Sequence, residues 1–147
     1  MAVAAACSDS DEAVSGGFKA LVDDSCRKHL TQSRPVVDTG DVAAKAASFR
    51  DLAERVGRVE ADVAAATTNN DADEASRTAI VGHLRSARAD LTKAAAAGEV
   101  GDSGAEREAL LAVTEAQHRL IEMEPFDFED CFRSQASPTS PVRPSDP

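Results

Sequence analysis

The sequence has no Trp and no Tyr, and only five Phe among its 147 residues. Aromatic and β-branched side chains favour strands, so this scarcity argues against a strand-rich fold. Of the apolar residues, which make up 42% of the chain, Ala is the commonest. Ala heads the helix-propensity scale because it loses no rotamer freedom in a helix. The composition therefore predicts an all-α fold with a core of small side chains, in a chain the size of one domain.

Basic residues are also scarce: 16 Lys and Arg stand against 26 Asp and Glu, which gives a net charge of -10. Binding to nucleic acid requires clustered cations that neutralise phosphates, and here the cations are scattered among acids. An anionic membrane surface would repel the chain for the same reason. We therefore expect no nucleic-acid partner and no electrostatic attachment to a membrane.

Sequence signatures of catalysis are missing as well. The three His lie on different predicted helices, and none belongs to a His-Glu-x-x-His zinc pattern. There is no Gly-x-Ser-x-Gly elbow and no Gly-rich phosphate loop after a strand. The sequence therefore predicts a protein that is not an enzyme, with no catalytic residue, no metal ligand and no cofactor.

One pair of residues leaves a metal-binding alternative open. Glu115 and His118 have the Glu-x-x-His spacing that supplies two ligands in di-iron helical bundles. Such sites need a second pair of this kind and two further Glu, and this chain has no second pair. We therefore expect the His118 side chain to be solvated, and keep a metal- or small-ligand-handling bundle around Glu115 and His118 as an alternative function.

Gly, Pro, Asn and Asp cluster at three places, residues 33–40, 67–71 and 98–104, and divide the region 11–133 into four segments. Each segment repeats apolar residues at three- and four-residue steps, which is typical of amphipathic helices. We predict helix caps at Asp71 and at Ser103, the latter in a capping box with Glu106. The economical fold is an antiparallel up-down bundle of four helices, or of three helices with an N-terminal arm. The Phe-rich run 126–132 is expected to plug one end.

The N-terminal segment carries a second kind of signal. Cys7 follows three Ala and precedes a polar, acidic stretch, Ser8 to Asp11. This pattern resembles the end of a bacterial lipoprotein signal peptide, in which small residues precede the Cys that is lipidated. The whole chain resembles small Ala- and Arg-rich exported lipoproteins of high-GC bacteria, whose functions are unassigned. The resemblance implies a lipid on Cys7, a tether over residues 1–10 and a reading frame that starts upstream of Met1.

With Cys7 assigned to the lipid, Cys26 and Cys131 remain as an even pair near the two ends of the folded region. An exported domain would join them in a disulfide. The alternative is that Met1 is the true start, Cys7 lies on a cytosolic tail, and both other thiols are reduced. In that case the chain is a cytosolic helical adaptor.

The predicted function is a non-enzymatic, lipid-anchored or secreted interaction or accessory module of the bacterial cell envelope. It would lie on the outer face of the cytoplasmic membrane and bind an envelope protein or a small ligand through a bundle face or the run 126–132. Residues 134–147 are predicted to be a Pro/Ser-rich disordered tail, with Pro at every third position from Pro138 to Pro147. The sequence does not determine the oligomeric state.

Overall fold

The computed structural model describes residues 13–31 and 40–136. Cys7, the predicted tether and the Pro repeat lie outside these residues. Within them the chain forms helices and no strands, so the predicted all-α class is confirmed. The helices are α1 (Gly16–Leu30), α2 (Val42–Ala64), α3 (Asp71–Glu99), α4 (Ser103–Ile121) and α5 (Phe128–Ala136). The last of these extends to Ala136, beyond residue 134, where the sequence analysis placed the start of the tail.

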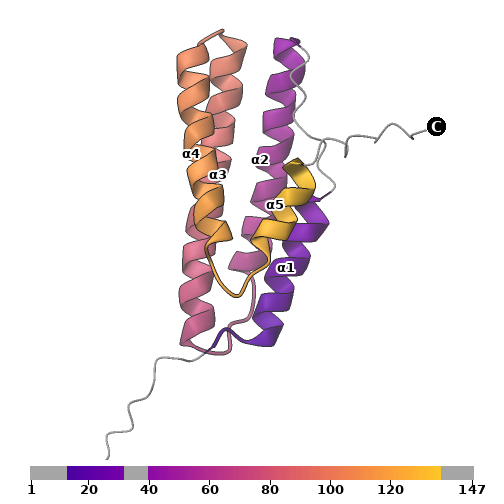
Figure 1. The fold of residues 1–147 in the computed structure, drawn as a ribbon, viewed down its shortest axis with the longest axis vertical. Coiled ribbons are helices and arrows are strands. Elements are labelled where there is room, and N and C mark those ends of the chain that lie inside the picture. The colour runs from indigo at the N-terminus through magenta and orange to yellow at the C-terminus, as the bar shows by residue number, and fades with distance from the viewer. Residues whose placement is uncertain (1–12, 32–39, 137–147) are drawn as a thin grey trace, which may run out of the picture.

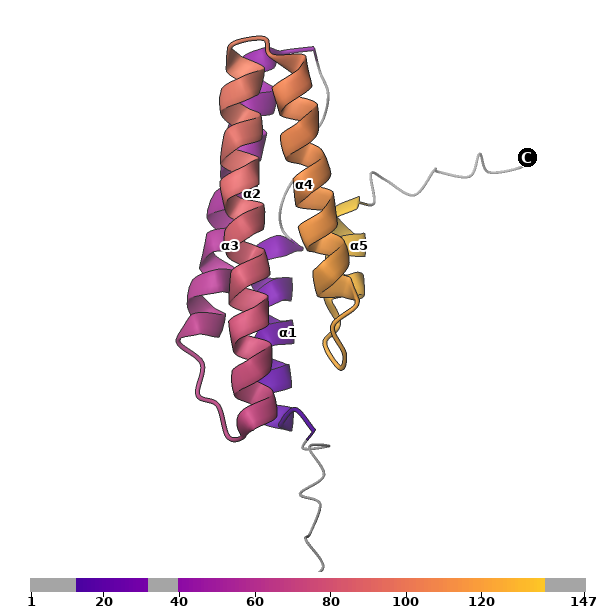
Figure 2. The ribbon, with the colours of Figure 1, turned by 90° about the vertical axis from the view of Figure 1, so that its left-hand side faces the viewer.

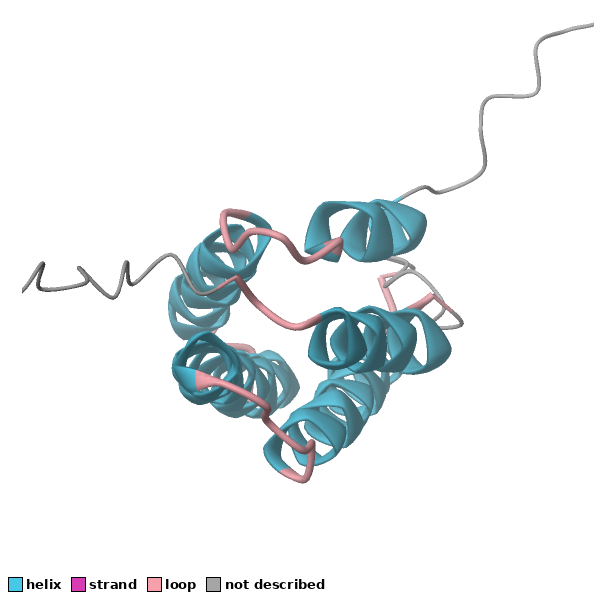
Figure 3. Cartoon of the chain, turned by 90° about the horizontal axis from the view of Figure 1, so that it is seen from below, coloured by secondary structure: helices cyan, strands magenta, loops and turns pink. Residues whose placement is uncertain are grey.

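Successive helices run in alternating directions, and each packs against the next (Figure 1). The last helix, α5, packs against the first, α1. Seen along the bundle, the helices therefore form a closed ring (Figure 3). Only α2, α3 and α4 reach the upper end, while α1 and α5 accompany them along the lower half (Figure 2). The helices therefore lie side by side around the middle of the bundle, and α1 and α3 extend furthest toward the lower end (Figure 2).

The core is built from small aliphatic side chains with a cluster of Phe at the α1–α5 contact. Alanines occupy many buried positions, as the composition predicted, and they allow the long helices to pack closely. Phe18 of α1 meets Phe126 edge-on, with ring centroids 5.9 Å apart. Phe128 then lies between Phe126 and Phe132, again at centroid distances of 5.9 Å. The buried alanines are Ala46, Ala53, Ala66, Ala87, Ala94, Ala95, Ala109 and Ala116.

A disulfide joins Cys26 of α1 to Cys131 of α5, with 6.1 Å between the two Cα atoms. Both cysteines are buried. The predicted disulfide is therefore present, but its setting differs from the expected one. The region 126–132 does not plug an end of the bundle, because its residues from Phe128 onward form a helix that lies beside α1 (Figure 1). This short helix, rather than α4, closes the ring onto α1.

Two predicted helix caps are displaced by one residue. The side chain of Asn70, not Asp71, caps α3 by accepting a hydrogen bond from the Asp73 N–H at 2.8 Å. Asp102, not Ser103, caps α4 by accepting from the Ala105 N–H at 3.0 Å. Apolar periodicity does not distinguish between neighbouring residues that can all act as helix caps. Each predicted cap is therefore wrong by one residue. Glu106 is consequently free of the predicted capping box.

This correction can be tested with two neighbouring substitutions. Asp102→Ala removes the acceptor at the start of α4 and is expected to lower the free energy of unfolding by about 1 kcal/mol. Ser103→Ala, inside the helix, is expected to change it by less than about 0.5 kcal/mol. Urea denaturation followed by circular dichroism measures both. If Ser103→Ala lowered the free energy of unfolding more than Asp102→Ala, Ser103 would be the cap of α4 after all.

Candidate functional site

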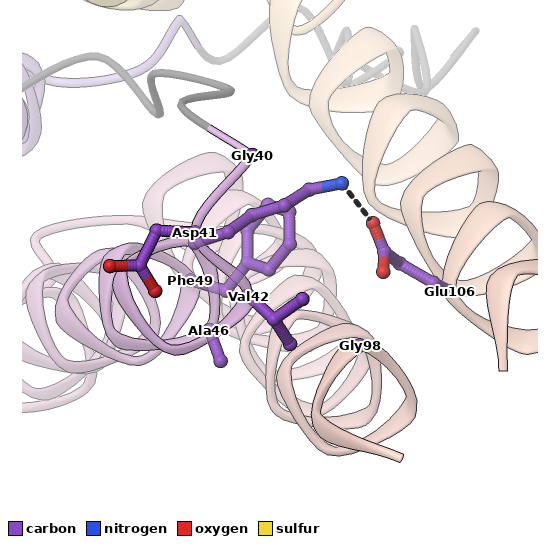
Figure 4. A pocket seen from close by; sticks show the side chains of 8 residues that line it. Gly40, Asp41, Val42, Ala46, Phe49, Gly98 and Glu106 are labelled. Carbon is purple, nitrogen blue, oxygen red and sulfur yellow. Dashed lines mark ion pairs between the residues drawn. The ribbon is translucent and has the colours of Figure 1, made fainter. Parts of the chain in front are cut away.

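A pocket opens at the upper end of the bundle, where the first turns of α2 and α4 meet the last turn of α3 (Figure 4). We call it the upper pocket. Its volume is about 110 Å³. The residues that line it are Gly40, Asp41, Val42, Lys45, Ala46, Phe49, Gly98 and Glu106. They come from three separate elements, so the pocket exists only in the folded bundle.

The first turn of α2 forms one side of the upper pocket. Gly40 has a φ of 72°, a left-handed conformation that glycine adopts without strain as the chain turns into the helix. Asp41 then caps α2, and its Oδ1 accepts hydrogen bonds from the N–H groups of Ala43 and Ala44 at 3.0 and 3.1 Å. Phe49 is buried and gives the pocket an apolar wall.

An ion pair crosses the pocket, marked by the dashed line in Figure 4. Lys45 Nζ lies 2.5 Å from Glu106 Oε1 and links the start of α2 to the start of α4. The other oxygen, Glu106 Oε2, lies against the backbone of Gly98, where a Cβ atom would come within 2.9 Å of it. Glycine at position 98 therefore permits the close approach of α4's carboxylate to α3.

In the upper pocket the hydrogen-bond donors have partners, whereas one acceptor oxygen has none among the described residues. Its ammonium group, on Lys45, is paired with Glu106, and the nearby N–H groups at the start of α2 are taken by Asp41. Glu106 Oε2 receives no hydrogen bond from any residue within 13–31 and 40–136. The pocket therefore offers an acceptor of negative charge beside apolar walls, and its donors are already occupied.

A second ion pair lies close to the upper pocket and fixes the end of α3. Arg50 of α2 binds Glu99, the last residue of α3. The hydrogen bond from the Arg50 guanidinium lowers the pKa of Glu99 below its ordinary value. About half of each side chain is exposed, so the pair contributes little stability, but it links α2 to the helix end that carries Gly98.

A smaller cavity lies between α2, α3 and α4. Its volume is about 50 Å³, and most of its lining is aliphatic side chains of these three helices, joined by Phe132 of α5. Little more than a water molecule or two would fit, and the walls offer few polar partners to hold water. We interpret this cavity as a packing gap beside α5. Its lining residues are Leu52, Val56, Leu84, Ala87, Leu91, Val113, Gln117, Leu120 and Phe132.

The alternative metal pair is not assembled into a site. Glu115 and His118 are exposed on α4, and each pairs along its own helix: Glu115 with Arg119 at 3.6 Å and His118 with Glu122 at 3.1 Å. In the part of the chain that the structure describes, no group of three or more His, Cys, Asp or Glu is arranged to hold a metal ion. His118 has the solvated position that the sequence predicted, and Glu115 is exposed on the same helix.

One Ser–Asp–His set comes together that the sequence analysis did not predict. Ser25 Oγ donates to Asp62 Oδ2 at 2.8 Å, and His29 Nε2 lies 3.0 Å from the same oxygen. The Ser25 hydrogen bond is the main cause that lowers the pKa of Asp62. A serine nucleophile needs the histidine between itself and the aspartate. Here the aspartate is central, so the set joins α1 to α2 and does not activate Ser25.

A buried carboxylate ties the start of α1 to the start of α3. Asp73 is 0% exposed, and it accepts hydrogen bonds from the Ser15 N–H at 2.7 Å, the Ser15 hydroxyl at 2.6 Å and the Asn69 N–H at 2.9 Å. Burial alone would raise the pKa of Asp73, but the hydrogen bonds from Ser15 and Asn69 outweigh it and lower the pKa. We call this arrangement the Ser15–Asp73 latch. Its lone pairs are engaged in holding two helices together.

Among the helices of the described residues, none combines the length with the apolar run that crossing a bilayer requires. Comparison with known protein families, with characterised proteins and with solved structures gives no match.

Proposed function

We propose that this protein is an exported, non-enzymatic interaction or accessory module of the bacterial cell envelope, anchored to the membrane by a lipid on Cys7. The observation that carries the proposal is the buried Cys26–Cys131 disulfide. Disulfides form and persist outside the reducing cytosol, which favours export over a cytosolic adaptor. A secreted form without the lipid would use the same fold.

The topology of the bundle suits an anchor at the N-terminal side. The start of α1 lies at the lower end, where Asn70 Nδ2 donates to the Ala13 carbonyl and the latch holds Ser15. The upper pocket lies at the opposite end of α3, a helix of 29 residues. At 1.5 Å per residue, α3 would separate the two ends by about 43 Å. A tethered bundle would thus hold the upper pocket away from the membrane surface.

The chemistry of the described residues favours binding over catalysis. The Ser25, Asp62 and His29 side chains are used in helix packing, and Asp73 is saturated by its donors. The upper pocket, in contrast, keeps an accessible carboxylate oxygen beside apolar walls. We therefore place the interaction surface at the upper end of the bundle.

The test of this function is membrane fractionation of the protein expressed from its own locus, with whatever sequence precedes Met1. We expect the wild type in the membrane fraction, extractable by detergent, and Cys7→Ala in the soluble fraction. Ser8→Ala, which keeps the thiol, is the matched control. Cofractionation of wild type and Cys7→Ala in the soluble fraction would overturn the anchor.

The disulfide gives an independent readout of compartment. Protein isolated under acid quench and alkylated without reductant should leave Cys26 and Cys131 unmodified. Alkylation of both residues in freshly quenched cells would place the chain in the cytosol.

A further inference from the structure

We propose that the upper pocket receives a cationic side chain, an Arg or a Lys, from a partner protein that docks on the upper end of the bundle. This inference rests on the interaction role proposed above, but not on the lipid anchor. Four features of the upper end carry it: its charge, its size, its apolar walls and the valines around it.

The charge of the pocket selects a cation over an anion. An anion would need Lys45 or the N–H groups at the start of α2, and these are held by Glu106 and Asp41. What the pocket offers is Glu106 Oε2, which is aimed at Gly98 and receives no hydrogen bond in the described part of the chain. The Glu106 side chain is only 14% exposed. A partner that donates a charge-assisted hydrogen bond satisfies this oxygen best.

The size and walls of the pocket fit the end of one long basic side chain. A cavity of about 150 Å³ holds a benzene molecule, so 110 Å³ admits a guanidinium or ammonium group with part of its stem. Phe49, Ala46 and Val42 give the methylene stem an apolar surface. Lys and Arg commonly bury their stems in this way while the charged group meets a carboxylate.

Two exposed valines beside the pocket favour a protein as the source of the cation. Val42 is 53% exposed and lines the pocket, and Val100 is 80% exposed and lies two residues beyond Gly98. A free alkylamine would contact the pocket alone, whereas a protein surface would also cover these valines. The net charge of -10 would further speed encounter with a basic partner.

The first experiment uses butylguanidinium as a probe of the pocket. We expect it to shift the amide signals of Val42, Lys45, Gly98 and Glu106 in the NMR spectrum of the ¹⁵N-labelled protein. Butyrate at the same concentration should not shift them. Equal shifts with butyrate, or shifts scattered over the surface, would overturn the cation site.

Two glycine substitutions in α3 give matched variants. Gly98→Ala places a methyl group 2.9 Å from Glu106 Oε2, whereas Gly82→Ala meets nothing within 4 Å. We expect Gly98→Ala to weaken butylguanidinium binding by about tenfold or more, as the loss of a charge-assisted hydrogen bond would. Gly82→Ala should leave it unchanged. Because Ala favours helices, both variants should fold. Unchanged binding to Gly98→Ala would remove Glu106 from the site.

A second experiment separates a protein partner from a free amine. The probes are the peptide acetyl-Val-Arg-Val-amide and its citrulline counterpart, which keeps the shape but lacks the charge. We expect the Arg peptide to bind more tightly than both butylguanidinium and the citrulline peptide. The gain over butylguanidinium should disappear in Val42→Ser/Val100→Ser, with Leu111→Ser as the control for an exposed apolar residue elsewhere. Equal affinity for the peptide and butylguanidinium would contradict the protein source. That result would not bear on the proposed envelope location, which the fractionation of Cys7→Ala tests separately.

Discussion

Replacing both Cys26 and Cys131 with Ser is expected to lower the free energy of unfolding by about 2–5 kcal/mol. The disulfide closes a loop over a sequence separation of 105 residues, and so removes many conformations from the unfolded chain. Total stabilities of domains this size are about 5–15 kcal/mol, so the loss is a large share of the total. Urea denaturation of the oxidised wild type and the double variant measures it directly.

The matched control for the disulfide variant is Cys7→Ser, which removes the third thiol and should leave the unfolding curve unchanged. The loss should appear first at α5. A helix of nine residues is not stable by itself, so without the disulfide it depends on weaker contacts, among them the packing of Phe128 and Phe132 and the hydrogen bond from the N–H of Asp127, just before α5, to Asp23 of α1. Hydrogen exchange at α5 should therefore accelerate more than at α3. An unfolding curve equal to that of the wild type would mean that the other contacts of α5 fix it without the disulfide.

Asp73→Ala is expected to lower Tm by about 10 °C or more, because it leaves the three donors of Ser15 and Asn69 without their acceptor. Asp71→Ala is the matched control, since Asp71 is exposed in the same turn of α3. It removes the same charge without removing a buried hydrogen bond, and should change Tm only slightly. Thermal unfolding followed by circular dichroism gives both values. Equal losses for the two variants would show that the charge at the helix start matters and the latch does not.

The same carboxylate makes the stability depend on acid. Because the pKa of Asp73 is lowered in the folded state, its contribution is complete above the pKa of an unfolded Asp, about 4. The contribution is lost as the pH falls through the lower, folded-state value. Wild-type Tm should therefore drop more steeply below pH 4 than the Tm of Asp73→Ala. Parallel pH profiles for the two proteins would contradict this assignment.

The helices were predictable because local signals agreed with one another. Apolar periodicity marked the long helices, and Gly, Pro and Asn clusters marked the breaks between them, and α2, α3 and α4 are separated at these clusters. The helix α5 was missed because nine residues span too few turns to show a period. The caps were displaced by one position, since neighbouring polar residues compete for the same donors.

The polar contacts could not be predicted from one sequence. Asp73 meets Ser15 across 58 residues of chain, and the upper pocket joins α2 to Gly98 and Glu106. Such contacts depend on how each helix is rotated about its axis relative to its neighbours. A periodic pattern identifies the buried face of a helix but not the residues that this face contacts on another helix. In the sequence, Gly98 opens the cluster 98–104, which predicts a break between helices and gives no sign of this contact. In the folded chain it is also the residue that Glu106 approaches.

The Ser15–Asp73 latch has a mechanical consequence. A pull on the N-terminal segment reaches the bundle at Ala13 and Ser15, and their hydrogen bonds to Asn70 and Asp73 pass it to the start of α3. The same helix carries Gly98 near its far end, beside the upper pocket. Tension between a tether and a partner held at that pocket would thus run along one continuous helix.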